Sequence, residues 1–222
     1  MTVPVTSTAP ARGTGSVARG VRTAVGVAIL VSLVVSFADA AGVDGFNPVN
    51  YFSYFTIESN ILAMVLMLGQ AIVPAWMVRN GRFRGAVTLY MTVTLLVYAV
   101  ILRPLGADVG EYRVWVDYIQ HTAGPIALIG DWFLFPPRDR YPSSLLAKWL
   151  VFPLAFLVYS LIRGSMVEWY PYPFLDPADG GYLAVTIASV AILVVFIALG
   201  SLIRWWPGYA QVHPDQIPEA SG

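Results

Sequence analysis

Two polar clusters interrupt otherwise apolar parts of this sequence, and both contain residue types that hydrolytic chemistry uses. They are Tyr-Phe-Thr-Ile-Glu-Ser-Asn at residues 54–60 and Asp-Tyr-Ile-Gln-His-Thr-Ala-Gly-Pro at residues 117–125. A hydroxyl beside an imidazole can become an activated nucleophile. An ionisable group within a membrane-spanning segment costs at least ~2.5–3.5 kcal/mol on insertion scales. Both clusters are therefore candidate functional sites.

Helical spacing places the polar groups of each cluster on one face. Thr56 and Asn60 are four residues apart, which puts a hydroxyl and an amide on the same side of a helix. Asp117 and His121 have the same spacing, so the carboxylate can accept a hydrogen bond from the imidazole and fix its tautomer. Pro125 leaves the carbonyl of residue 121 without its helical partner, which favours a kink with room for water or a substrate.

Each of these residues also has a purely structural interpretation. A threonine in a spanning helix usually bonds the carbonyl four residues earlier, and asparagine and serine often join neighbouring helices. A single histidine can be a packing residue, and a proline can be an ordinary kink. Arg103 and Arg163 end apolar segments, where they can bind a phosphate or carboxylate or can cap a helix C-terminus. The residues alone leave catalysis, binding and packing open.

The elements that must position these residues are membrane-spanning helices. Of the 222 residues, 57% are hydrophobic and 12% are charged, against roughly 45–50% and 25% in soluble domains. Seven Trp and twelve Tyr suit anchoring at two membrane–water interfaces. A formal net charge of zero gives no reason to expect a nucleic-acid partner. With no Cys and two His, we expect no metal site, and no cofactor motif is found.

Apolar segments near the ~20 residues that cross ~30 Å of hydrocarbon recur six times. The predicted spans cover residues 21–38, 53–78, 85–102, 114–135, 145–163 and 180–203. Asp117, His121 and Asp131 interrupt the fourth span, and Asp131 is expected to anchor its end at the membrane interface. The sequence thus predicts an all-α bundle of six transmembrane helices at residues 21–206. Residues 1–20 and 207–222 are predicted to be disordered tails.

The basic residues divide unequally between the two sides of such a bundle. One side receives only Arg103, Arg113 and Arg163, whereas the other receives ten: Arg12, Arg19, Arg22, Arg79, Arg82, Arg84, Arg138, Arg140, Lys148 and Arg204. The positive-inside rule then places both termini in the cytoplasm of a multipass plasma-membrane protein. Both polar clusters fall in the outer half of the bilayer. At 1.5 Å per residue, Thr56 and His121 differ by only ~6 Å in depth.

A series of motifs resembles one family of membrane proteins. The motifs are Tyr-Phe-Thr-Ile-Glu-Ser-Asn-Ile-Leu at 54–62, His-Thr-Ala-Gly-Pro at 121–125, Pro-Leu-Ala-Phe-Leu-Val-Tyr-Ser-Leu-Ile-Arg-Gly at 153–164 and Tyr-Pro-Tyr-Pro-Phe-Leu-Asp at 170–176. In order and spacing they resemble the bacterial branch of the androgen-induced membrane protein family, which includes the androgen-dependent regulator of tissue factor pathway inhibitor. The eukaryotic relatives are multipass hydrolases that cleave fatty acid esters of hydroxy fatty acids with an intramembrane Thr and His. The resemblance implies that Thr56 is the nucleophile and His121 the base.

The resemblance implies a membrane-embedded hydrolase of lipid esters. His121 would take the hydroxyl proton of Thr56, and the alkoxide would attack an ester carbonyl. Asp117 would orient the imidazole. Asn60, or a backbone N–H near the start of the helix, would stabilise the oxyanion. The partners of such a protein are membrane lipids, and Arg103 or Arg163 would bind the carboxylate of a fatty-acid-like substrate.

Two other classes stay open at this stage. The first is a lipid-binding or scaffolding membrane protein without chemistry. The second is a small proton-coupled transporter in which Glu58, Asp117 and His121 titrate. Transporters of this kind often show internal repeats or broken helix pairs, and we find no convincing repeat. A hydrolase requires both Thr56 and His121, whereas a carrier depends on the acidic residues.

Overall fold

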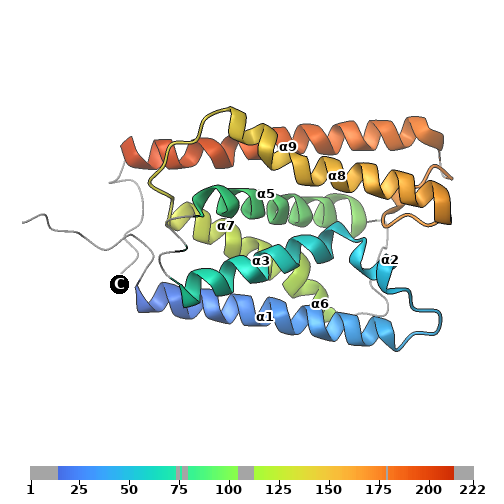
Figure 1. Ribbon diagram of the computed structural model, residues 1–222, viewed down its shortest axis with the longest axis horizontal. Helices are drawn as coiled ribbons and strands as arrows, with labels where there is room; N and C mark the ends of the chain where they lie inside the picture. The colour runs from blue at the N-terminus through green and yellow to red at the C-terminus, as the bar shows by residue number, and fades with distance from the viewer. Residues whose placement is uncertain (1–14, 74–75, 77–79, 105–112, 179, 213–222) are drawn as a thin grey trace, which may run out of the picture.

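A computed structural model of the chain describes residues 15–73, 76, 80–104, 113–178 and 180–212. All regular structure in these ranges is helical, and the long helices run beside one another along the longest axis (Figure 1). In chain order the elements are α1 (Ser16–Ala41), α2 (Pro48–Phe52), α3 (Phe55–Ile72), α5 (Gly81–Val97), η1 (Tyr98–Leu102), α6 (Val114–Tyr118), η2 (Ile119–Ala123), α7 (Gly124–Leu134), α8 (Ser144–Val167), η3 (Pro173–Leu175) and α9 (Gly181–Val212). The fold is all-α. η1 and η2 are π-helical, and η3 is a short 3₁₀-helix.

Five helices are long and apolar enough to cross a membrane. They are α1, α3, the continuous pair α5 and η1, α8 and α9, and they match five of the six predicted segments. Such a set is compatible with a multipass membrane protein. The chain between Val114 and Leu134 is also helical throughout, but it is divided among α6, η2 and α7. Crossing by this fourth segment stays a prediction, as does the orientation of the termini.

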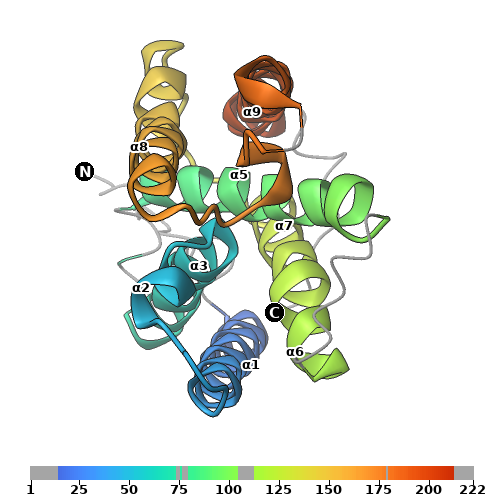
Figure 2. The same ribbon diagram turned by 90° about the vertical axis from the view of Figure 1, so that its right-hand side faces the viewer.

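The helix α5 lies at the centre of the bundle. Seen end-on, α8 and α9 lie on one side of it, and α1 and α3 lie on the other (Figure 2). Contacts join α5 to α3, α7, α8 and α9. Gly85 lets α5 approach α8 closely, because a Cβ there would lie 2.4 Å from the Trp149 ring. The outward faces of α1, α8 and α9 remain apolar, with residues such as Val34, Val151 and Leu183 exposed, as lipid-facing surfaces require.

Helices α1 and α9 extend beyond the predicted spans. α1 begins at Ser16, within the predicted N-terminal tail, and Arg19 Nε fixes its first turn by donating to the carbonyl oxygen of Ala71 (3.0 Å). α9 continues through Pro207 to Val212, and Trp206 Nε1 ties it to the carbonyl oxygen of Phe133 (3.2 Å). These side-chain bonds to distant backbone explain why helix replaces the predicted tail here. The tail predictions for residues 1–14 and 213–222 lie outside the described residues.

A buried ionic cluster joins three helices at the end of the bundle where α1 begins. Arg22 of α1 lies 2.6 Å from Asp131 Oδ1 of α7, and Arg84 of α5 lies 3.0 Å from Asp131 Oδ2. Both arginine side chains are only 2% exposed. Arg84 also donates to the carbonyl oxygen of Phe135 (3.1 Å). The two arginines neutralise the Asp131 carboxylate between the helices. Its predicted role as an anchor at the membrane interface stays a prediction.

Candidate functional site

Two π-helical segments form part of the site, and a proline follows two residues after the end of each. In η1 the N–H of Arg103 donates to the carbonyl oxygen of Tyr98 (2.9 Å), and Pro104 follows. In η2 the N–H of Gly124 donates to the carbonyl oxygen of Ile119, and Pro125 follows. A proline supplies no N–H to the carbonyl four residues earlier, so the helix widens by one residue at this point. A Cβ at residue 124 would lie 2.8 Å from the Ile119 oxygen, which is why glycine occupies this position.

The two π segments bring together a tyrosine, a carboxylate and the histidine. The rings of Tyr98 and His121 stack with centroids 4.2 Å apart, and the Tyr98 hydroxyl donates to Asp117 Oδ2 at 2.5 Å. His121 Nδ1 lies 2.7 Å from Asp117 Oδ1 and 3.2 Å from the Asp117 carbonyl oxygen. The pairing of Asp117 with His121 that the sequence spacing predicted is present. Both neighbours of Nδ1 are acceptors, so Nδ1 carries the proton of the neutral ring and Nε2 keeps its lone pair.

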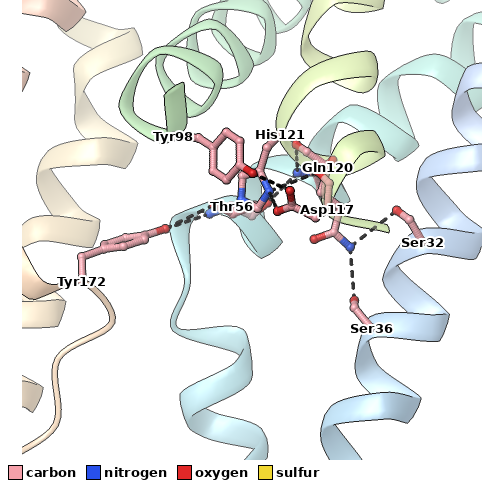
Figure 3. Close-up of polar contacts among 9 residues, drawn as sticks. Ser32, Ser36, Thr56, Tyr98, Asp117, Gln120, His121 and Tyr172 are labelled. Carbon is pink, nitrogen blue, oxygen red and sulfur yellow. Dashed lines mark hydrogen bonds and ion pairs between the residues drawn. The ribbon is translucent and has the colours of Figure 1, made fainter. Parts of the chain in front are cut away.

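Asn60 connects the turn that carries Thr56 to the turn that carries His121. Its Nδ2 donates to the carbonyl oxygens of Thr56 (2.9 Å) and Gln120 (3.1 Å), and the side chain is fully buried. An amide nitrogen has two hydrogens, and both are used here. Asn60 in this position has no N–H left for an oxyanion, so it positions η2 against the start of α3. Figure 3 shows the side chains of Thr56, Tyr98, Asp117 and His121 gathered between these elements.

Thr56 is the second residue of α3 and is 8% exposed. Its Oγ1 makes no hydrogen bond within its own helix, and it lies 3.4 Å from the hydroxyl oxygen of Tyr172, which comes from the segment between α8 and α9. The Thr56 N–H donates to the same oxygen at 3.2 Å. Thr56 and His121 are not hydrogen bonded to each other in this structure. The structure thus places the turns of Thr56 and His121 together without a hydrogen bond between the two side chains.

A narrow apolar groove opens beside Thr56. It has a volume of about 90 Å³ and runs among α3, α5, α8 and α9. Hydrocarbon side chains such as Val93, Leu157 and Phe196 make up most of its lining, and Thr56 and Tyr172 are also lining residues. His121 is not part of the lining. Thr56 therefore has the groove on one side and, through Asn60, the turn of the imidazole on another.

The two arginines predicted to bind substrate are not among the residues that line the groove. Arg163 is not at the end of its helix, because α8 continues to Val167. It donates to Asn50 Oδ1 (2.6 Å), and its guanidinium lies over the Trp169 ring, 5.2 Å from the centroid. Arg103 is exposed, follows η1 directly and acts electrostatically on Asp117. Of the two, Arg103 is the one whose charge reaches the imidazole cluster.

Three side chains of the site were not singled out from the sequence, although Gln120 lies in the cluster at 117–125 and Tyr172 in the motif at 170–176. Tyr98 and Tyr172 belong to other segments than the two polar clusters, and only folding brings them to His121 and Thr56. Gln120 is 4% exposed and donates to Ser36 Oγ of α1 (3.2 Å). One feature of the sequence could have pointed to the segment of Tyr98. Pro104 follows Arg103 as Pro125 follows Gly124, and such a proline predicts a second helix irregularity.

Comparison of this chain with models of protein families, with curated proteins and with solved structures gives no match. Function is therefore inferred from the geometry of the site and from the sequence motifs.

Proposed function

We propose that this protein is a multipass membrane hydrolase of lipid esters, with Thr56 as nucleophile and His121 as general base. One observation carries the proposal: Asn60 joins the turns of Thr56 and His121, while Asp117 holds the imidazole in the tautomer that leaves Nε2 free to accept a proton. The resemblance of the motifs at 54–62 and 121–125 to the androgen-induced membrane protein family supports the same assignment.

In the proposed reaction, His121 Nε2 takes the hydroxyl proton of Thr56 and Oγ1 attacks the ester carbonyl. Hydrogen bonds between nucleophile and base are often looser without substrate. We propose that substrate binding brings Thr56 Oγ1 within hydrogen-bond distance of His121 Nε2. The carboxylate of Asp117 then stabilises the imidazolium. The acyl-threonine intermediate is released by water, with His121 again acting as base.

The groove supports a lipid as the substrate. A narrow cavity lined by hydrocarbon suits an acyl chain, because burying each CH₂ contributes about 0.8 kcal/mol. Thr56 lies on its wall, so a chain in the groove places its ester next to Oγ1. We propose the plasma membrane as the location, in keeping with the five apolar helices.

The test is a lipid-ester hydrolysis panel on purified protein. We expect Thr56→Ala and His121→Ala each to abolish turnover without loss of folding. Thr94→Ala is the matched control, because Thr94 also lines the groove but its hydroxyl bonds Ser59 (3.2 Å). Labelling by a fluorophosphonate probe is expected to require Thr56. Labelling that persists in Thr56→Ala would show that the nucleophile assignment is wrong.

A proton-coupled carrier is the second candidate, and the half-buried group of Tyr98, Asp117 and His121 is the observation that favours it. A carrier predicts that Thr56→Ala is mild while Asp117→Asn stops transport. A lipid-binding protein without chemistry predicts acyl-chain binding with no turnover. The hydrolysis panel separates the hydrolase from the other two classes, and the effect of Asp117→Asn on transport separates the carrier from the binding protein.

A further inference from the structure

The segment between α8 and α9 brings one phenolic hydroxyl to the start of α3. Tyr172 immediately precedes η3, and its hydroxyl oxygen accepts the N–H of Thr56 (Figure 3). Tyr54, the residue before α3, provides no side-chain cap. The first N–H groups of a helix have no partner within it, so the phenol satisfies a donor that the helix leaves open. This contact places the Tyr172 hydroxyl 3.4 Å from Thr56 Oγ1.

Aromatic neighbours hold the Tyr172 ring in place. It stacks on Phe174 with centroids 5.1 Å apart and meets the edge of Tyr54 at 5.7 Å. The residue is 9% exposed. Tyr172 and Thr56 both line the groove, and their hydroxyl oxygens lie 3.4 Å apart, so we expect a substrate in the groove to meet both. A fixed donor beside the reacting carbonyl is what electrostatic preorganisation requires.

The hydroxyl is also in the right protonation state to donate. Burial raises the pKa of Tyr172 to about 12, so the phenol keeps its proton at neutral pH. Its oxygen accepts the Thr56 N–H, and among the described residues only Thr56 Oγ1 lies within reach of its own proton. A donor that itself accepts a hydrogen bond is strengthened by it. Asn60 cannot take this role, because both of its amide hydrogens bind carbonyl oxygens.

We propose that Tyr172 is a further catalytic residue, whose hydroxyl donates a hydrogen bond to the ester carbonyl oxygen while Thr56 attacks the carbonyl carbon. This inference rests on the proposed function. In the step, the Thr56 proton moves to His121 Nε2, the bond from Oγ1 to carbon forms, and the carbonyl π pair moves onto oxygen. The Tyr172 O–H stabilises that negative charge. When the carbonyl re-forms, the bond to the alcohol breaks and the alcohol leaves with the proton from His121.

The experiment compares Tyr172→Phe with wild type in hydrolysis of p-nitrophenyl octanoate. Removing one oxyanion donor lowers kcat by about 10²–10³-fold, and we expect this loss with KM little changed. Fluorophosphonate labelling of Thr56 should slow in parallel, because the probe places a P=O oxygen at the same position. Tyr90→Phe is the matched control: Tyr90 is buried and donates to the Trp149 carbonyl oxygen (2.9 Å), but it does not line the groove. Its kcat should match wild type.

The outcomes separate the two proposals. If Thr56→Ala retains turnover, the proposed function fails. If Thr56→Ala is inactive but Tyr172→Phe keeps wild-type kcat, only the role of Tyr172 is wrong. A faster Tyr172→Phe enzyme would also overturn it, because the hydroxyl would then block the carbonyl position. Thermal melting reports whether loss of the helix cap unfolds the protein. In that event 3-fluorotyrosine at position 172 keeps the cap and makes the phenol more acidic, and an unchanged kcat would contradict the proposal.

Discussion

The two ring nitrogens of His121 have different surroundings. Nδ1 faces the carboxylate and the carbonyl oxygen of Asp117, whereas the described residues make no hydrogen bond to Nε2. Tyr98 covers one face of the ring and bonds the second carboxylate oxygen. The carboxylate thus fixes the tautomer of His121 and also keeps the imidazole aligned with η1. An amide in place of the carboxylate no longer fixes the tautomer but keeps the shape of the side chain.

For this reason Asp117→Asn is expected to lower kcat strongly while the protein stays folded. The amide can donate to Nδ1, which moves the ring proton to Nε2 and blocks its role as base. Loss of the correct tautomer reduces kcat by roughly 10⁴-fold in a serine-histidine-aspartate site, so a loss of at least about 10²-fold is expected here. The measurement is p-nitrophenyl octanoate hydrolysis, with circular dichroism as the folding control. Wild-type turnover in Asp117→Asn would show that His121 is not the base.

At the scale of elements, side chains repair the backbone where prolines interrupt helices. Pro153 lies inside α8 and removes the donor for the carbonyl of Trp149, and the Tyr90 hydroxyl of α5 donates to that oxygen instead (2.9 Å). Pro104 and Pro125 are accommodated by the π segments η1 and η2. The bond from Tyr90 also fixes how α5 packs against α8. The same is true of the cluster of Arg22, Arg84 and Asp131, which joins α1, α5 and α7.

Asp131→Asn is expected to destabilise the bundle severely, because it removes the carboxylate that pairs with two arginines at 2% exposure. Breaking a buried ion pair by removing one partner costs about 3–5 kcal/mol. Asp39→Asn is the matched control. Its partner Arg113 is 63% exposed at 3.3 Å, and such surface pairs contribute less than about 1 kcal/mol. The measurement is the thermal midpoint in detergent. Equal midpoints for the two variants would mean that the cluster does not hold the helices together.

At the scale of the whole molecule, charge separates the two ends of the bundle. The end that carries α2 and the segment between α8 and α9 also carries the start of α3, with Thr56 and Tyr172 (Figure 1). The opposite end carries Arg19, Arg82, Arg140 and Arg204. The positive-inside rule therefore predicts that the candidate site faces the outer leaflet.

Because the chain has no cysteine, single-cysteine labelling can test this orientation. Val114, Ser143 and Ala178 are exposed positions at the ends of the fourth segment and after α8. We expect a membrane-impermeant maleimide to label Val114→Cys and Ala178→Cys in intact cells, and Ser143→Cys only after permeabilisation. Labelling of Val114→Cys and Ser143→Cys from the same side would show that the segment from Val114 to Leu134 does not cross. The reversed pattern would invert the orientation.

Local patterns in the sequence are enough to predict which segments are helical and which residues share a helical face. Hydropathy depends on composition within one segment, so five of the predicted spans are found as apolar helices. The pairing of Asp117 with His121 follows from spacing along one helix, which needs no tertiary information. Helices α1 and α9 extend beyond the predicted spans, where side chains bond distant carbonyl groups.

Only the tertiary structure decided what each polar side chain meets. The polar clusters at 54–60 and 117–125 lie together because Asn60 links α3 to η2. Tyr98 and Tyr172, from segments remote in sequence, contact Asp117 and Thr56 there. Likewise, local sequence did not show that Asp131 pairs with two buried arginines. The free energy of a charge or hydroxyl inside a membrane protein depends on its partners, and packing between helices selects those partners.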